Sequence, residues 1–247
     1  MVPADERRAC LVVGAGPGLG SAVARAFARE GLAVVATRRS RNVEEAERLA
    51  QAIRDEGGEA HAMGVDARDE DETVALFRRI ENEIAPLEVV VFNIGANVRF
   101  PIAETTARVY RKVWEMAAFA GFLAGREAAR VMLPRGRGTV VFTGATASMR
   151  GGNGFAAFAG AKHATRALAQ SMARELAPKG IHVAHVVVDG LMDGAFARRI
   201  DPDAAEHLAE GRIIDPDAVA RTYVSLWKQP RGAWTHELDV RPWTETF

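Results

Sequence analysis

Short apolar runs, most of them rich in valine, recur along the chain and are separated by longer amphipathic segments. Seven runs have the length of a β-strand and are apolar on both faces, as is typical of strands buried in a parallel sheet. They cover residues 10–14, 33–37, 61–66, 89–95, 139–144, 182–190 and 236–241.

The segments between these runs have the periodicity of helices, with apolar residues three and four positions apart. They cover residues 19–29, 43–55, 69–84, 107–133, 155–178 and 216–227. Asp215 followed by Pro216 marks the start of the last one, because aspartate is a good N-cap and proline is favoured at the first helical position. The alternation predicts an α/β fold: a doubly wound parallel sheet of seven strands in a single domain, 1–247.

Residues 191–214 form the longest polar and irregular stretch of the pattern. This stretch follows the sixth predicted strand. In an open parallel sheet, a long loop that leaves the carboxyl end of a strand can cover a ligand crevice. We therefore expect a substrate-covering insertion here.

Charge and composition exclude several classes of function. Lysine plus arginine equals aspartate plus glutamate at 32 each, so no net field draws the chain to nucleic acid or to a membrane. The chain starts without an apolar run of signal length, and none of its apolar stretches has the length of a membrane span, so we expect a soluble, cytoplasmic protein. Cys10 is the only cysteine and no histidine pair has metal-ligand spacing, so we predict a buried core thiol and no metal site.

A glycine-rich segment, GAGPGLG, lies directly between the first predicted strand and the first predicted helix. Such a turn lets the backbone approach a pyrophosphate, which then sits at the positive end of the helix. A tight turn that only packs a helix on a strand uses the same residues, but the position in the first unit favours nucleotide binding. The candidate phosphate-binding residues are Gly14, Gly16, Pro17, Gly18, Leu19 and Gly20.

The residues after the second strand bear on the choice of cofactor. Where an acidic residue would hold a ribose 2'-hydroxyl, the sequence reads Thr37-Arg38-Arg39. Guanidinium groups suit a 2'-phosphate, so Arg38 and Arg39 favour NADP(H) over NAD(H). The alternative is that both arginines are simply solvated at the end of the strand.

The spacing of Gly14, Gly18 and Gly20, the NIG that ends the fourth strand, and Lys162 in the helix after the fifth strand together resemble the short-chain dehydrogenase/reductase family. The resemblance covers nearly the whole chain and implies a Rossmann-like domain. It also implies a homodimer or homotetramer packed through helices 107–133 and 155–178.

The same resemblance implies roles for four further positions. Asp66 would meet the adenine ring, and Asn93 and Gly95 would border the cofactor. Lys162 would form a hydrogen bond with the nicotinamide ribose. The apolar pattern alone is also compatible with a solvated lysine at this position.

The chain departs from the family at the residues that move the proton. Members of the family use an asparagine, a serine and a tyrosine together with the lysine. The matching positions here are Ala117, Ala145 and Phe158. Phenylalanine has no exchangeable proton and alanine donates no side-chain hydrogen bond, so the family's proton route is absent. A shifted alignment would make Ser148 the surviving hydroxyl, and Tyr110 is a poor substitute because it lies two turns from Ala117.

Asp189 is the remaining candidate for proton transfer. It follows the sixth strand, at the sheet edge where ligands bind in this architecture, and it could act as an acid or base or could cap the following turn. Asp193 and Arg150 are weaker candidates by the same placement. His163 and His185 are expected to be solvated and structural, respectively.

Three functions remain open on this basis. The first is an NADP(H)-dependent oxidoreductase with an atypical proton donor, in which Lys162 and Asp189 are the catalytic candidates. The second is an NADP(H)-binding sensor or partner protein without turnover, and the third is a lyase or isomerase that uses the same pocket. The sequence does not identify the substrate.

Overall fold

One seven-stranded sheet organises the computed structural model, which describes residues 7–246. Its strands run in the order β3-β2-β1-β4-β5-β6-β7, and every pairing is parallel. The bounds are β1 Ala9–Val13, β2 Ala33–Arg38, β3 Ala60–Gly64, β4 Leu87–Phe92, β5 Gly138–Thr143, β6 Ile181–Val188 and β7 Glu237–Val240. The predicted Rossmann-like architecture is confirmed, with all seven predicted runs present as strands.

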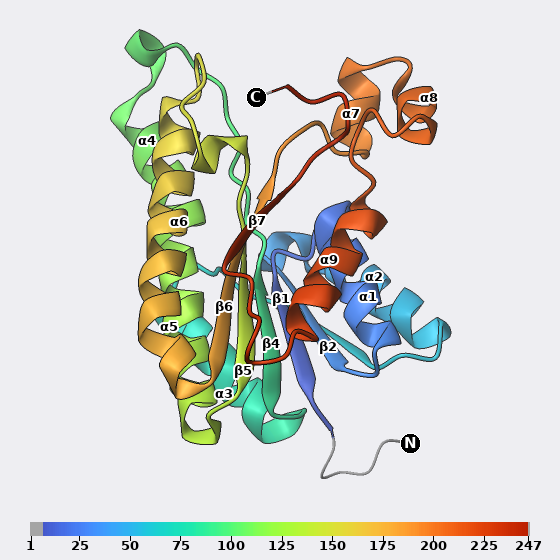
Figure 1. Ribbon diagram of the computed structural model, residues 1–247, viewed down its shortest axis with the longest axis vertical. Coiled ribbons are helices and arrows are strands. Elements are labelled where there is room, and N and C mark those ends of the chain that lie inside the picture. Colours follow the sequence, from blue (N-terminus) through green and yellow to red (C-terminus); the bar gives the residue numbers. More distant parts are fainter. Residues whose placement is uncertain (1–6, 247) are drawn as a thin grey trace.

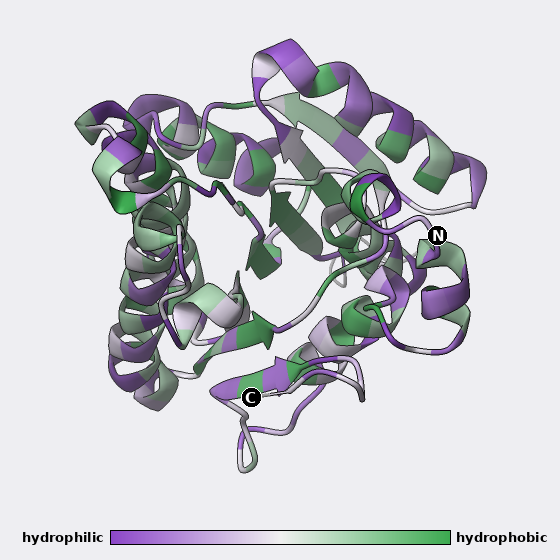
Figure 2. Cartoon of the chain, turned by 90° about the horizontal axis from the view of Figure 1, so that it is seen from above, coloured by the Kyte–Doolittle hydropathy of each residue, from purple (hydrophilic) through white to green (hydrophobic). Residues whose placement is uncertain are grey.

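Helices cover both faces of the sheet and form two apolar cores with it. α1 (Leu19–Arg29), α2 (Val43–Asp55) and α9 (Pro216–Trp227) pack on one face. α3 (Glu70–Glu83), α5 (Ala120–Met132) and α6 (Ala156–Leu176) pack on the other face (Figure 1). Seen from above, the strands at the centre are largely apolar, while polar residues lie on the outer sides of the helices (Figure 2).

The predicted helix 107–133 is not a single regular helix. It consists of α4 (Ala107–Trp114), a π-helical turn (Glu115–Phe119) and α5. Single π-helical turns inside longer helices are often found at functional sites. Here the turn contains Ala117, whose carbonyl accepts a hydrogen bond of 2.9 Å from the Thr165 hydroxyl of α6.

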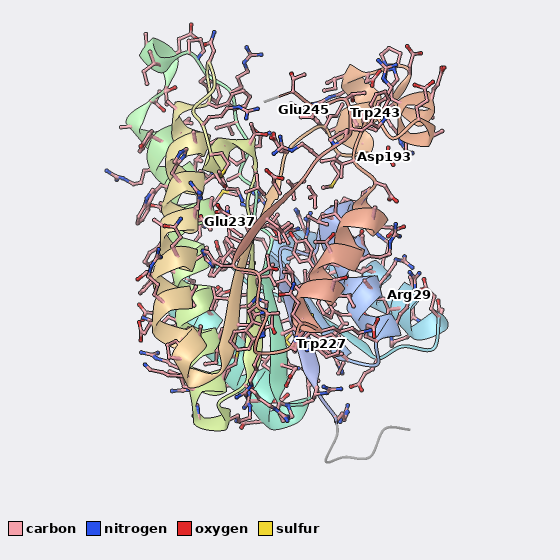
Figure 3. The ribbon with its side chains drawn as sticks, in the orientation of Figure 1. Arg29, Asp193, Trp227, Glu237, Trp243 and Glu245 are labelled. Atoms are coloured by element: carbon pink, nitrogen blue, oxygen red, sulfur yellow. The ribbon has the colours of Figure 1, made fainter. Side chains whose placement is uncertain are left out.

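The stretch 191–214 is less irregular than its sequence pattern suggested, and its role in covering a substrate stays a prediction. It contains two short helices, α7 (Ala195–Ile200) and α8 (Ala204–Ala209). They form because Ala197, Ala204 and Ile213 bury a small apolar cluster of their own among many charged residues. After β7 the chain crosses this region, and Trp243 donates a hydrogen bond of 3.1 Å to the Glu210 carbonyl (Figure 3).

The helix start predicted at Asp215 is confirmed, since its carboxylate accepts a hydrogen bond of 2.9 Å from the Asp217 N–H. Cys10 is fully buried in β1, and burial raises the pKa of its thiol. No helix within residues 7–246 is long and apolar enough to cross a membrane.

Candidate functional site

A cavity of about 200 Å³ opens at the carboxyl ends of the first four strands. β1 lies between β2 and β4, so the strand order reverses at this point, which is where ligands bind in doubly wound sheets. The predicted cofactor residues of four separate segments meet in its lining: Gly14, Arg38, Arg39, Asp66, Asn93 and Gly95.

The glycine-rich loop forms a close turn between β1 and α1. Gly14 and Gly18 have φ values of 94° and 93°, which side chains rarely tolerate. A Cβ on Gly20 would lie 2.5 Å from the Gly14 carbonyl oxygen, so only glycine fits there. Asn93 holds the loop from β4, because its side-chain amide donates to the same carbonyl over 3.1 Å.

The first turn of α1 is open to a ligand. Its N-cap is Gly18, and no side chain caps the helix. The N–H groups of the first turn therefore lack the side-chain acceptor that a serine or aspartate would supply. The Ser21 N–H already donates to the Gly16 carbonyl over 3.0 Å. An anion beside this turn would accept from the N–H groups before Ser21 and would meet the positive end of the helix dipole.

The two arginines that follow β2 have different surroundings. Arg38 forms a salt bridge with Glu45, and its guanidinium lies across Gly16. The Arg39 side chain forms no hydrogen bond or salt bridge within the described part of the chain, although the Arg39 carbonyl accepts a hydrogen bond of 2.7 Å from the Asn42 N–H. Burial, together with the positive charges of Arg41 and Arg68, lowers the pKa of Arg39. An added anion near Arg39 would offset this loss of solvation and the repulsion from Arg41 and Arg68.

Asp66 lines the cavity, but its carboxylate already has a partner. Arg68 donates to it from Nε over 2.9 Å and from Nη2 over 2.5 Å. These hydrogen bonds lower the pKa of the Asp66 carboxyl group. Arg68 was not recognised from the sequence, although its position two residues after Asp66 was visible.

Lys162 lies on α6 and is only 2% exposed. Its ammonium donates to the Thr143 carbonyl over 2.7 Å and to the Ile94 carbonyl over 3.1 Å. These carbonyls lie at or just past the carboxyl ends of β5 and β4. Burial lowers the pKa of Lys162 to about 8. The structure therefore places a buried amine between the carboxyl ends of β4 and β5, in contact with Ile94, which lines the cavity.

The surroundings of Phe158 are apolar. Its ring packs with Ala147 and Ala159 and with the partly exposed side chains of Ala145 and Phe155. Ala117 is fully buried and belongs to a neighbouring apolar cluster.

Two hydroxyl groups considered from the sequence are engaged elsewhere. Ser148 is fully buried and accepts a hydrogen bond of 3.2 Å from the Ala145 N–H. The Tyr110 hydroxyl lies against α6 beside Gly160, where a Cβ would approach it to 2.9 Å. The sequence could not show which way either group points.

Asp189 is 2% exposed, and its carboxylate has side-chain partners. One oxygen accepts a hydrogen bond from the Thr146 hydroxyl. The other lies 3.9 Å from Arg150 and 3.8 Å from Arg241. Thr146 was missed by sequence reasoning, although it directly follows Ala145 in the loop after β5.

The other candidates lie in ordinary structural contacts. Asp193 is paired with Arg198 at 3.1 Å, and the His163 ring contacts the Ala159 carbonyl one turn back on α6. His185 is buried in β6 against Glu237, which also pairs with Arg166 at 2.6 Å. Burial lowers the pKa of His185 to about 4, so the ring is neutral near pH 7.

A glycine-rich loop that opens a helix at the switch point of a doubly wound sheet defines a Rossmann-like nucleotide-binding protein. The family assignment is more specific. The short chain dehydrogenase family model matches residues 8–204, and the chain belongs to this family.

Characterised relatives align over most of their length. The chain is 31% identical to cis-4-hydroxycyclohexanecarboxylate dehydrogenase of Sinomonas cyclohexanicum, with 92% of this chain and 91% of the relative covered. It is 29% identical to gluconate 5-dehydrogenase of Gluconobacter oxydans, with 89% and 81% covered.

Solved structures have the same fold. A short-chain dehydrogenase from Rhodopseudomonas palustris is 49% identical, with a TM-score of 0.82 and with 96% of this chain and 99% of that chain covered. A variant of actinorhodin polyketide ketoreductase, solved with NADPH, is 25% identical, with a TM-score of 0.86 and 98% of each chain covered.

Proposed function

We propose that this protein is an NADP(H)-dependent oxidoreductase with an atypical proton donor. The observation that carries the proposal is the cavity at the switch point, which Gly14, Asn93 and Ile94 help to line. The buried Lys162 donates to the Ile94 carbonyl. Its relatives named above are oxidoreductases, and one structural neighbour was solved with NADPH.

The residues of the cavity fit a dinucleotide phosphate. The open first turn of α1 suits the pyrophosphate, and Lys162 suits the hydroxyls of the nicotinamide ribose. Arg39 is better placed than Arg38 to bind a 2'-phosphate, because Arg38 is already paired with Glu45. This assignment supports NADP(H) over NAD(H) and refines the sequence prediction, which named both arginines.

The bound cofactor would supply or accept the hydride, which is the difficult part of the chemistry. The side chains of Phe158, Ala145 and Ala117 donate no proton to a substrate oxygen. An iminium ion or a polarised C=C bond requires less of a protein acid than a ketone does. For a step that moves a proton, Asp189 with its Thr146 contact is the candidate group.

The test is nucleotide binding followed by turnover. We expect calorimetry to show that NADPH binds more tightly than NADH. We then expect NADPH oxidation with at least one member of a panel of ketones, imines and enones. Failure of both nucleotides to bind would overturn the proposal, because Lys162 and the open α1 turn would then have no ligand.

A second candidate function is an NADP(H)-binding sensor or partner protein without redox turnover. The apolar cluster around Phe158 favours it, since this cluster occupies the place of the family's proton-transfer groups. Nucleotide binding without NADPH oxidation across the whole panel is the result expected for a sensor. A lyase or isomerase built on Asp189 has no comparable support, because the relatives named above are oxidoreductases.

We also propose that the protein is cytoplasmic and assembles as a homodimer or homotetramer through α4, α5 and α6. Three aromatic rings support this surface, with centroids 6.1 Å apart between Trp114 and Phe119 and 6.2 Å apart between Phe119 and Phe122. Trp114 and Phe122 are 43% and 41% exposed, which leaves an apolar stack in water in the single chain. Sedimentation of Trp114→Glu should give a smaller species than wild type.

A further inference from the structure

We propose that the substrate is a compact, ring-sized apolar molecule that carries a carboxylate. Its apolar body would lie on Phe155 and Phe158, and its carboxylate would pair with Arg99. This inference rests on the proposed function and specifies the substrate class of the same site.

The wall beside Lys162 is apolar and built from one cluster. Phe158 and Ala147 form its buried part, and Phe155 and Ala145 are its partly exposed members. A sugar-like substrate on this wall would lose water from its hydroxyl groups without gaining hydrogen bonds, which is costly. An apolar ring would gain from the same contact, and two aromatic rings favour a flat partner.

Each of the two phenylalanine rings has a positively charged side chain beside it. The Lys162 ammonium lies 5.9 Å from the centroid of the Phe158 ring. The Arg99 guanidinium lies 5.7 Å from the centroid of the Phe155 ring. Phe155 directly precedes α6, Phe158 lies in its first turn and Lys162 lies one turn further on. Arg99, from the loop after β4, lies beside Phe155 at the outer end of this row.

The two charges differ in what they can bind. Lys162 is buried and donates to the carbonyls of Thr143 and Ile94, and Ile94 lines the cofactor cavity. Arg99 is exposed, and within residues 7–246 it forms no ion pair. The loop that carries it is nevertheless fixed, because the Phe100 N–H donates to the Gly154 carbonyl over 2.9 Å. Arg99 is therefore an exposed cation on an anchored loop, and it has no anionic partner within residues 7–246.

The length of this row limits the size of the substrate. Residues 155 to 162 rise by about 10 Å along α6. This length accommodates one six-membered ring with a carbonyl or alcohol at the inner end and a carboxylate at the outer end.

The loops around the same end of the sheet expose further apolar side chains. Ile102 after β4, Met149 after β5 and Phe196 after β6 are 73%, 43% and 55% exposed. These loops lie at the upper end of the molecule, where the strands end (Figure 1). An apolar molecule would meet favourable surface before it reaches Phe155.

The test uses three probes with the NADP⁺ complex of the full chain: 4-acetylbenzoate, acetophenone and D-fructose. The first has the ring, the ketone and the carboxylate, the second lacks the carboxylate, and the third is a polyol. Calorimetry measures binding, and NADPH oxidation is measured separately. We expect 4-acetylbenzoate to bind most tightly and fructose not to bind.

Variants separate the two contacts. Arg99→Met should weaken the binding of 4-acetylbenzoate by about 10- to 100-fold, because a charge-assisted contact is lost. The binding of acetophenone should stay unchanged. Phe155→Ser should weaken both ring compounds. Arg221→Met, which removes an exposed arginine on α9, is the matched control and should change neither.

Equal affinity for 4-acetylbenzoate and acetophenone, tighter binding of fructose, or no effect of Arg99→Met would overturn the substrate class. If NADP⁺ binds and these results are found, the proposed cofactor function stands and only this inference fails. If neither NADPH nor NADP⁺ binds the wild-type protein, the proposed function fails and this inference fails with it.

Discussion

Lys162→Met should change how the stability of the protein depends on pH. Burial lowers the pKa of Lys162 from 10.5 to about 8 in the folded chain. The folded state therefore binds fewer protons than the unfolded state between these values. Stability must rise with pH across this window, and methionine at position 162 removes this contribution.

The size of the effect follows from the same pKa values. The gap between 10.5 and 8 corresponds to about 3 kcal/mol of destabilisation at pH values well below 8. From pH 7 to pH 10, the free energy of unfolding of wild type minus that of Lys162→Met should rise by about 2 to 3 kcal/mol. Burial raises the pKa values of Cys10 and Tyr223 in both proteins, so the contributions of these two groups cancel when the two free energies are subtracted.

The assay is urea unfolding of both proteins, without nucleotide, at several pH values from 7 to 10. His185 is the charged or titratable neighbour to consider, but its pKa of about 4 lies outside this range. The substitution also changes packing and removes two hydrogen bonds. These effects shift the difference in free energy of unfolding by the same amount at every pH, so they do not change its dependence on pH. A constant difference from pH 7 to 10 would refute the reasoning and show that the amine is solvated in the folded protein.

Three further predictions can be tested on the same preparations. Arg39→Ala should weaken the binding of NADPH by about 10-fold or more and have little effect on the binding of NADH. The loss of NADPH binding should be larger than in Arg38→Ala, and calorimetry measures all four affinities. Phe158→Tyr combined with Ala145→Ser should raise ketone reduction by NADPH by about 100-fold or more if the site is otherwise intact, as measured at 340 nm. Tyr223→Phe should lower the free energy of unfolding by about 1 kcal/mol in urea, because it removes a buried hydroxyl that is hydrogen-bonded to β5.

The arrangement of strands and helices could be predicted because the apolar pattern is strong and continuous. The runs that became β1, β2 and β5 are valine-rich and fully buried in their cores, so burial and strand propensity agree there. The helix 43–55 was predicted with the bounds of α2 because its buried residues repeat every three to four positions. The pattern could not reveal the π-helical turn at 115–119, since an extra residue in one turn changes the period too little.

The sequence predicted which residues lie near the candidate site, because their positions along the chain determine this. It did not predict the partners of their side chains. Strand ends meet at one edge of a parallel sheet, so Gly14, Asn93 and Arg39 were expected to lie near one another. Side-chain partners depend on the direction of each side chain, which the sequence does not contain. The pairing of Arg38 with Glu45 and the contact of Thr146 with Asp189 were missed for this reason.

Lys162 and the apolar cluster around Phe158 affect the stability of the fold in opposite directions. This difference ranks the proposed functions. A buried amine without a carboxylate partner destabilises a fold, and methionine would fill the same space without that cost. An arrangement of this kind is expected where a ligand benefits from the group. The wall at Phe158, by contrast, stabilises the fold as any apolar cluster does and supplies no proton. Nucleotide binding is thus the property for which the site is built at an energetic cost. For proton transfer, we propose either Asp189 with its Thr146 contact or a substrate that needs no proton from the protein.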